Sequence, residues 1–278
     1  MLRSVTLLFR RVWAFVVRDF QLLLSYRLQF FLRVLSILLM VTALFFVAKT
    51  FTGRADCPCA ESPFTQWRDP LAAWITGLAV LNYFMTGFSS LANAIRAEQT
   101  QGTLESVLLT PISVPVVVVA SSAWEFVQAT LFSFLYLFFG WLFFGVHFRG
   151  SYLLALLFLI LTTLVLACLG ILSASFAMVF KRGDPFAVLL GTGSALFSGV
   201  FFPTQLLGAG FGTVSRILPP TYGLDGIRRV LIEGQGLSEV SDPLLTLLLF
   251  LVALLPFSLW VFSRAIRRAK REGSLIQY

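Results

Sequence analysis

Residues 95–114 read IRAEQTQGTLESVLLTPISV and form a polar interruption between two long apolar segments. Gly102 permits a turn, and the hydroxyl of Thr103 is suited to cap the helix that follows. Glu105 places negative charge near the amino terminus of that helix, and Pro111 ends it. The stretch therefore predicts a short amphipathic helix, although these residues alone fit a plain loop between two helices equally well.

The composition identifies the kind of protein that surrounds this stretch. Hydrophobic residues make up 58% of the chain and charged residues only 12%, with a mean hydropathy of +0.88. A soluble domain of this length does not have such a composition, so the sequence predicts an all-α polytopic membrane protein in a lipid bilayer. The net charge of +8 resides largely at the ends of apolar segments, where it orients helices, and nucleic acid is not an expected partner.

The apolar segments predict six transmembrane helices, since about 20 residues are needed to cross about 30 Å of hydrocarbon. The predicted spans are residues 28–48, 70–93, 114–146, 152–180, 186–202 and 243–262. The third is longer than one perpendicular crossing requires, so it is either tilted or begins with a piece in the membrane interface. The polar stretch between the second and third spans is taken as residues 95–113.

The two ends of the chain are rich in arginine. Residues 1–27 carry Arg3, Arg10, Arg11, Arg18 and Arg27 among apolar residues, which predicts an amphipathic helix lying in the headgroup layer. A secretory signal peptide fits less well, because the basic region is too long and no short apolar core with a cleavage site follows. Residues 263–278 form a basic tail.

Residues 203–242 are apolar in a periodic way but too interrupted to cross the bilayer. One helical stripe consists of Leu207, Phe211, Val214 and Leu218, and a second stripe consists of Leu224, Ile227 and Leu231. The prediction places Asp225, Arg228 and Arg229 on the face opposite the second stripe. Two short helices separated by Pro219 and Pro220 indicate an external reentrant helical hairpin that covers a cavity.

Several single residues have two readings. Gly191, Ala195 and Gly199 recur at intervals of four, which favours close helix packing. Glu125 is either a functional acid inside the membrane or, beside Trp124, a residue of the headgroup boundary. Cys57 and Cys59 are a redox pair of an external loop or have no special role, since bridging such close neighbours needs unusual geometry. With one histidine and scattered cysteines, no metal site is predicted.

The distribution of basic residues gives the orientation. Fourteen of the 21 lysines and arginines fall on the side of the two termini in this arrangement, and seven fall on the other side. By the positive-inside rule both termini are cytoplasmic, and the 95–113 stretch is cytoplasmic with them.

Two motifs in this order of elements resemble the membrane subunit of type-2 ABC exporters, the ABC-2 permease family. The cytoplasmic motif consists of Glu98, Gly102, Thr103, Leu104, Glu105, Leu108, Leu109, Thr110 and Pro111. The external motif consists of Phe201, Phe202, Pro203, Leu218, Pro219, Tyr222, Leu224, Asp225 and Arg228. The resemblance covers essentially the whole chain.

The resemblance implies a multi-pass exporter subunit of a bacterial or archaeal cytoplasmic membrane. The chain would form half of a pathway for a drug, lipid or glycan, with a second copy or a homologous permease as the other half. ATP and Mg²⁺ would be held by a separate nucleotide-binding subunit, and no cofactor is expected on this chain, which lacks a GxxxxGK[ST] loop. The residues implied in coupling to that ATPase are Glu98, Gly102, Thr103, Leu104, Glu105, Leu108 and Pro111.

The substrate route is predicted from aromatic residues on the second and fifth spans. These are Tyr83, Phe84, Phe88, Phe197 and Phe201. Two other classes of function stay open. A secondary transporter or channel would need ionisable residues near the middle of the membrane, for which Glu125 is the candidate. A membrane-embedded enzyme would need a nucleophile, acid or metal constellation, and no catalytic residue is predicted.

Overall fold

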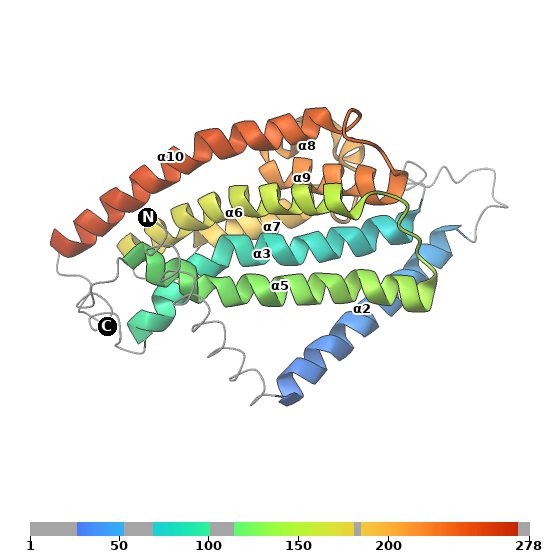
Figure 1. Ribbon diagram of the computed structural model, residues 1–278, viewed down its shortest axis with the longest axis horizontal. Coiled ribbons are helices and arrows are strands. Elements are labelled where there is room, and N and C mark those ends of the chain that lie inside the picture. Colours follow the sequence, from blue (N-terminus) through green and yellow to red (C-terminus); the bar gives the residue numbers. More distant parts are fainter. Residues whose placement is uncertain (1–26, 53–68, 101–113, 181–184, 272–278) are drawn as a thin grey trace.

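The computed structural model describes residues 27–52, 69–100, 114–180 and 185–271. These residues form a bundle in which α3 packs between α5 and α6, α10 lies along α6, and α2 lies obliquely against α5 (Figure 1). The long helices are α2 (Arg27–Thr52), α3 (Pro70–Thr100), α5 (Val114–Phe144), α6 (Tyr152–Phe180) and α10 (Ser241–Arg271). The shorter elements are α7 (Pro185–Phe197), η1 (Thr204–Leu207), α8 (Gly208–Ile217), α9 (Pro219–Arg228) and η2 (Arg229–Glu233).

Five of the described helices are long and apolar enough to cross a bilayer. The apolar stretches are Arg27–Thr50, Pro70–Leu91, Trp124–Phe144, Tyr152–Phe176 and Ser241–Ala265. Because hydrocarbon offers backbone groups no water to bond, apolar runs of this length satisfy their hydrogen bonds within a helix. The prediction of an all-α membrane protein is confirmed for the described residues.

Helix α3 occupies the centre of the bundle. Within its most apolar window, 78% of the residues are buried by the rest of the protein, compared with 11% for α2 and 11% for α10. The rest of the chain therefore leaves most side chains of α2 and α10 uncovered. α3 packs against α2, α5, α6, α7 and α9.

The fifth predicted span, residues 186–202, is only partly helical. α7 has 13 residues, which correspond to about 20 Å and fall short of the roughly 30 Å hydrocarbon core. The chain turns just beyond it, where Gly199 has a φ of +82°, a conformation that glycine adopts easily. α7 therefore ends at Phe197, five residues before the predicted end of the fifth span at Phe202, and α7 alone is too short to cross the bilayer.

The first residues of the polar stretch, 95–100, are helical and belong to α3. α3 continues without a break to Thr100 and has 31 residues, about 46 Å of helix, which exceeds the hydrocarbon thickness. Residues 101–113 lie outside the described residues, and so do residues 1–26 of the predicted interfacial helix. α5 begins at Val114 and also has 31 residues, so the long third segment is one continuous helix.

Glycines allow α3 and α6 to approach closely. A Cβ atom at Gly170 would overlap the carbonyl oxygen of Gly87, and a Cβ atom at Gly87 would lie 2.6 Å from Cβ of Leu166. Both contacts are closer than real Cβ atoms allow. The two helices can therefore keep this separation only while both positions lack a side chain.

Helices α8 and α9 form the predicted pair of short helices, called the α8–α9 hairpin below. The apolar stripe of α9 and η2 is inside: Leu224, Ile227 and Leu231 are buried. In contrast, Phe211 and Val214 on α8 are exposed, with 59% and 41% of their surface accessible. The second predicted stripe is therefore buried within this chain, while Phe211 and Val214 of the first stripe are largely exposed.

Candidate functional site

A row of polar side chains joins α3 to α5. Three hydrogen bonds cross between these helices: Asn82 Nδ2 to the carbonyl oxygen of Ala129 at 3.1 Å, Tyr83 Oη to Thr130 Oγ1 at 2.6 Å, and Ser133 Oγ to the carbonyl oxygen of Ala79 at 2.6 Å. Such bonds in a membrane contribute about 0.6 kcal/mol each on average. The three bonds lie within two neighbouring turns of each helix and connect α3 to α5, which are called the α3–α5 pair below.

The first turn of α3 is fixed at the other end of the pair. Oδ1 of Asp69 accepts hydrogen bonds from the main-chain nitrogens of Leu71 (3.1 Å) and Ala72 (3.2 Å), an arrangement that caps the helix. The indole nitrogen of Trp74 donates to the carbonyl oxygen of Phe201 at 2.9 Å. The start of α3 is therefore bound to the segment that follows α7.

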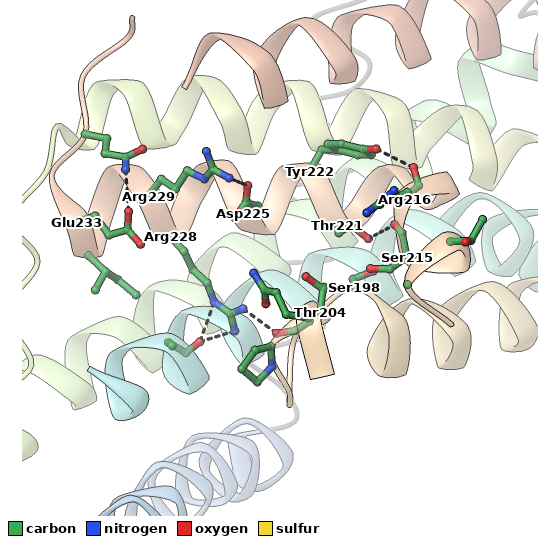
Figure 2. A pocket seen from close by; sticks show the side chains of 18 of the residues that line it. Ser198, Thr204, Ser215, Arg216, Thr221, Tyr222, Asp225, Arg228, Arg229 and Glu233 are labelled. Atoms are coloured by element: carbon green, nitrogen blue, oxygen red, sulfur yellow. Dashed lines mark hydrogen bonds and ion pairs between the residues drawn. The ribbon is translucent and has the colours of Figure 1, made fainter. Parts of the chain in front are cut away.

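Arg228, the last residue of α9, reaches across to the same place. Its Nε and Nη2 donate to the carbonyl oxygen of Ala73 at 3.2 and 2.7 Å, Nη1 donates to Gly199 O at 2.6 Å, and Nη2 also donates to Val200 O at 3.1 Å. Figure 2 shows the side chain of Arg228 and hydrogen bonds that it makes. The contacts of Arg228, together with the bond from Trp74, are called the Arg228 joint below. The joint connects three segments: the first turn of α3, the turn after α7, and α9.

The guanidinium of Arg228 is enclosed by protein but stays charged. Burial lowers the pKa of Arg228 to about 9, and the nearby carboxylate of Asp225 opposes that shift. At neutral pH its hydrogen bonds are therefore charge-assisted, which makes them stronger than bonds between neutral groups. Gly77 contributes by having no side chain, since a Cβ there would lie 2.8 Å from Nη2 of Arg228.

A cavity of about 870 Å³ opens beside this joint, within the size range of small-molecule sites. Its charged lining residues are Asp69, Arg216, Asp225, Arg228, Arg229 and Glu233. Several of them bond to neighbours: Arg229 Nη2 lies 2.8 Å from Asp225 Oδ2, and Gln235 Nε2 donates to Glu233 Oε2 at 2.8 Å (Figure 2). Ser198 also faces the cavity, is 2% exposed, and its hydroxyl has no hydrogen-bond partner among the described residues. The cavity is thus a polar chamber between α8, α9 and the start of α3.

Most of the predicted coupling residues cannot be placed. Glu98 belongs to the last turns of α3, but its side chain lies outside the described residues. The others, Gly102, Thr103, Leu104, Glu105, Leu108 and Pro111, fall in the undescribed 101–113 segment. What the structure does establish is that this segment connects the two members of the hydrogen-bonded α3–α5 pair.

The five aromatic residues predicted for the substrate route have different surroundings. Tyr83 lies in the contact between α3 and α5, while Phe84 and Phe88 are 0% and 1% exposed in the core. The ring of Phe197 stacks on Phe211 at 5.6 Å. None of the five lines the cavity beside Arg228, so the route stays a prediction.

The three residues predicted for helix packing have two different roles. On α7, a Cβ at Gly191 would lie 2.9 Å from the sulfur of Met85 on α3, and Ala195 is buried. α7 therefore packs closely on α3 within this chain. Gly199 lies beyond the end of α7 and shapes the turn that offers its carbonyl oxygen to Arg228.

The prediction that Arg228 lies opposite the apolar stripe of α9 is wrong. Arg228 follows Leu224 by four residues and precedes Leu231 by three, a spacing that puts all three on one helical face. That spacing was the signal for an inward-facing arginine. The hydrogen-bonding roles of Asn82 and Ser133 had no comparable signal, because they depend on the register of α3 against α5.

Comparison with models of known protein families identifies the family of this chain. A family model described as ABC-2 type transporter matches residues 10–232, which is most of the chain. No curated protein is similar enough to count as a match.

Proposed function

Because the chain belongs to the ABC-2 type transporter family, we propose that it is the permease subunit of an exporter driven by a separate ATPase. The subunit forms half of a pathway for an amphipathic or hydrophobic molecule such as a drug, a lipid or a glycan. A second copy, or a homologous permease, forms the other half. ATP and Mg²⁺ bind to the partner subunit, and this chain converts closure of that partner into movement of its helices.

The observation that carries this proposal is the α3–α5 pair. Residues 101–113 connect these two helices, so a force applied to that segment acts on both. The three hydrogen bonds between α3 and α5 make the helices respond together rather than separately. A push from a partner on the connecting segment would thus move the most buried helix of the bundle, α3, with α5.

The partner contact itself is proposed for Glu98 and the short helix around Gly102–Leu109. Glu98 and Glu105 would meet basic residues of the ATPase in a partly desolvated contact, where opposite charges set both orientation and strength. Thr103 and Pro111 would set the start and end of the helix that enters the partner's groove.

The orientation follows from the basic helix ends. α3 and α10 run toward the left end of Figure 1 and α2 and α5 run away from it. The basic residues at the end of α10 therefore lie on the same side of the bundle as the end of α3 at Thr100 and the start of α5 at Val114. Arg264, Arg267 and Arg268 are among those residues. By the positive-inside rule this face is cytoplasmic, and the α8–α9 hairpin is then a reentrant element of the external face.

The first test is reconstitution with an ATPase partner. The chain and a nucleotide-binding subunit encoded beside it are co-expressed, purified together and placed in vesicles. We expect a stable complex whose ATP hydrolysis is coupled to export of an amphipathic dye. Dye movement that needs a proton gradient and no ATP would favour a secondary transporter and contradict the proposal.

The aromatic route is tested by leucine substitutions. The positions are Tyr83, Phe84, Phe88, Phe197 and Phe201. Leucine is preferred to alanine because truncating a fully buried phenylalanine to alanine costs about 3–5 kcal/mol of stability and would confound the result. If the route is correct, at least one substitution changes the export of a large substrate relative to a small one by about tenfold. An unchanged substrate spectrum in all five variants would place the route elsewhere.

A further inference from the structure

The α8–α9 hairpin is attached to the far end of the same helix that leads to residues 101–113. α3 begins at the Arg228 joint and ends at Thr100, and it contains no proline after Pro70. α3 is one continuous helix from Pro70 to Thr100, so the Arg228 joint and residues 101–113 are connected through the same element. The joint therefore lies at the opposite end of α3 from the predicted contact with the ATPase.

The hairpin is internally tied, so that it moves as one piece. Three hydroxyl groups bond to main-chain carbonyl oxygens across its junctions: Ser215 Oγ to Phe197 O at 2.7 Å, Thr221 Oγ1 to Ser215 O at 2.8 Å, and Tyr222 Oη to Arg216 O at 2.7 Å. The first bond ties α8 to α7, and the other two tie α9 to α8. Movement of α9 is therefore passed to α8 and to the walls of the cavity.

We propose that Arg228 is a positioning residue that makes the α8–α9 hairpin follow α3, so that movement started at residues 101–113 reshapes the cavity at the other face. This proposal rests on the proposed function. Its strength comes from the geometry of a single side chain that bonds the first turn of α3 and the Gly199–Val200 turn at the same time.

The chemistry of the joint requires arginine in particular. The planar guanidinium donates four hydrogen bonds to three separate carbonyl oxygens, those of Ala73, Gly199 and Val200. A lysine ammonium has one nitrogen and cannot reach separated acceptors with the same fork. Lysine at this position keeps the positive charge while breaking the connection between the segments, which makes it the most informative substitution.

The experiment compares Arg228→Lys with Arg149→Lys in the reconstituted complex. Arg149 is a matched control because its side chain is exposed and its main-chain nitrogen, which donates to Leu231 O at 2.9 Å, is unaffected. The readouts are ATP hydrolysis, substrate exported per ATP, and the rate at which a membrane-impermeant maleimide modifies a cysteine introduced as Phe211→Cys. The natural cysteines, Cys57, Cys59 and Cys168, are replaced by alanine in every variant.

In the unmodified complex and in Arg149→Lys, ATP is expected to change the maleimide rate at position 211. In Arg228→Lys, ATP hydrolysis persists, but the ATP-dependent change in that rate and the substrate exported per ATP both fall about tenfold, the effect of losing one charge-assisted hydrogen bond. A residue needed only for stability would lower assembly and hydrolysis together. Arg228→Lys behaving like Arg149→Lys would overturn the proposal.

A second variant keeps the test decisive if Arg228→Lys does not assemble. Trp74→Phe retains the ring but removes the donor to Phe201 O, the other bond of the joint. It is expected to lower export per ATP about threefold, less than an arginine variant because that bond is not charge-assisted. Normal coupling in Trp74→Phe would then overturn the proposal. Failure of the proposed function is recognised separately, since the unmodified complex would itself show no ATP-dependent export.

Discussion

Replacing Glu105 with lysine is expected to abolish most ATP-driven transport while the protein remains inserted and folded. Glu105 belongs to the short polar segment of the sequence that joins α3 and α5. In the proposed contact its carboxylate meets a basic residue of the ATPase, and removing one member of such a buried pair costs about 2–5 kcal/mol. Lysine adds repulsion to that loss, so transport should fall about a hundredfold.

The measurement is transport in vesicles that contain both subunits, together with thermal unfolding of the purified chain. Glu239→Lys is a suitable control, because Glu239 is an exposed acid whose carboxylate bonds only locally, to the main-chain nitrogen of Gly236 at 3.1 Å. The control should transport normally. Normal transport by Glu105→Lys itself would refute the role of this residue in coupling.

Substituting Gly170 with alanine is expected to destabilise the bundle strongly. The added methyl group would overlap the carbonyl oxygen of Gly87, a backbone atom that cannot rotate away, so α3 and α6 must separate. Overpacking of this kind costs about 1–3 kcal/mol. The loss outweighs the roughly 1 kcal/mol that alanine gains over glycine from its better helix propensity.

Gly193→Ala provides the matched control, since a Cβ at Gly193 has nothing within 4 Å. It should leave the thermal unfolding midpoint in detergent unchanged or raise it. Gly170→Ala should lower that midpoint and reduce the amount of folded protein that can be extracted. Equal midpoints for the two variants would show that α3 and α6 do not pack as described.

Hydropathy was sufficient to find the long helices, because a helix that crosses the bilayer needs about 20 consecutive apolar residues, and such runs can be recognised in the sequence. The predicted span at residues 152–180 coincides with α6, and the second predicted span begins at Pro70, where α3 begins. Helix ends in polar surroundings were harder to predict. α3 continues past residue 93 to Thr100, and α10 continues past residue 262 to Arg271, because nothing in these polar stretches breaks a helix.

The contacts between helices could not be read in the same way. The sequence predicts Arg228 on the face opposite the apolar stripe of α9. In the structure its guanidinium instead donates to carbonyl oxygens of the Gly199–Val200 turn and of the first turn of α3, which only the folded chain brings together. The early end of α7 depends on that same turn. Asn82 and Ser133 act through the alignment of α3 with α5, which no local spacing encodes.

The most direct test of the account is the side of the membrane on which residues 98–110 lie. Thr103→Cys, in a chain without its natural cysteines, is treated with a membrane-impermeant maleimide in intact cells and in inside-out vesicles, with Phe211→Cys as the reference for the opposite face. The account predicts that position 103 reacts only in the vesicles and position 211 only in the cells. Reaction of position 103 in intact cells would place the segment outside, beyond the reach of any cytoplasmic ATPase, and would contradict the proposed function.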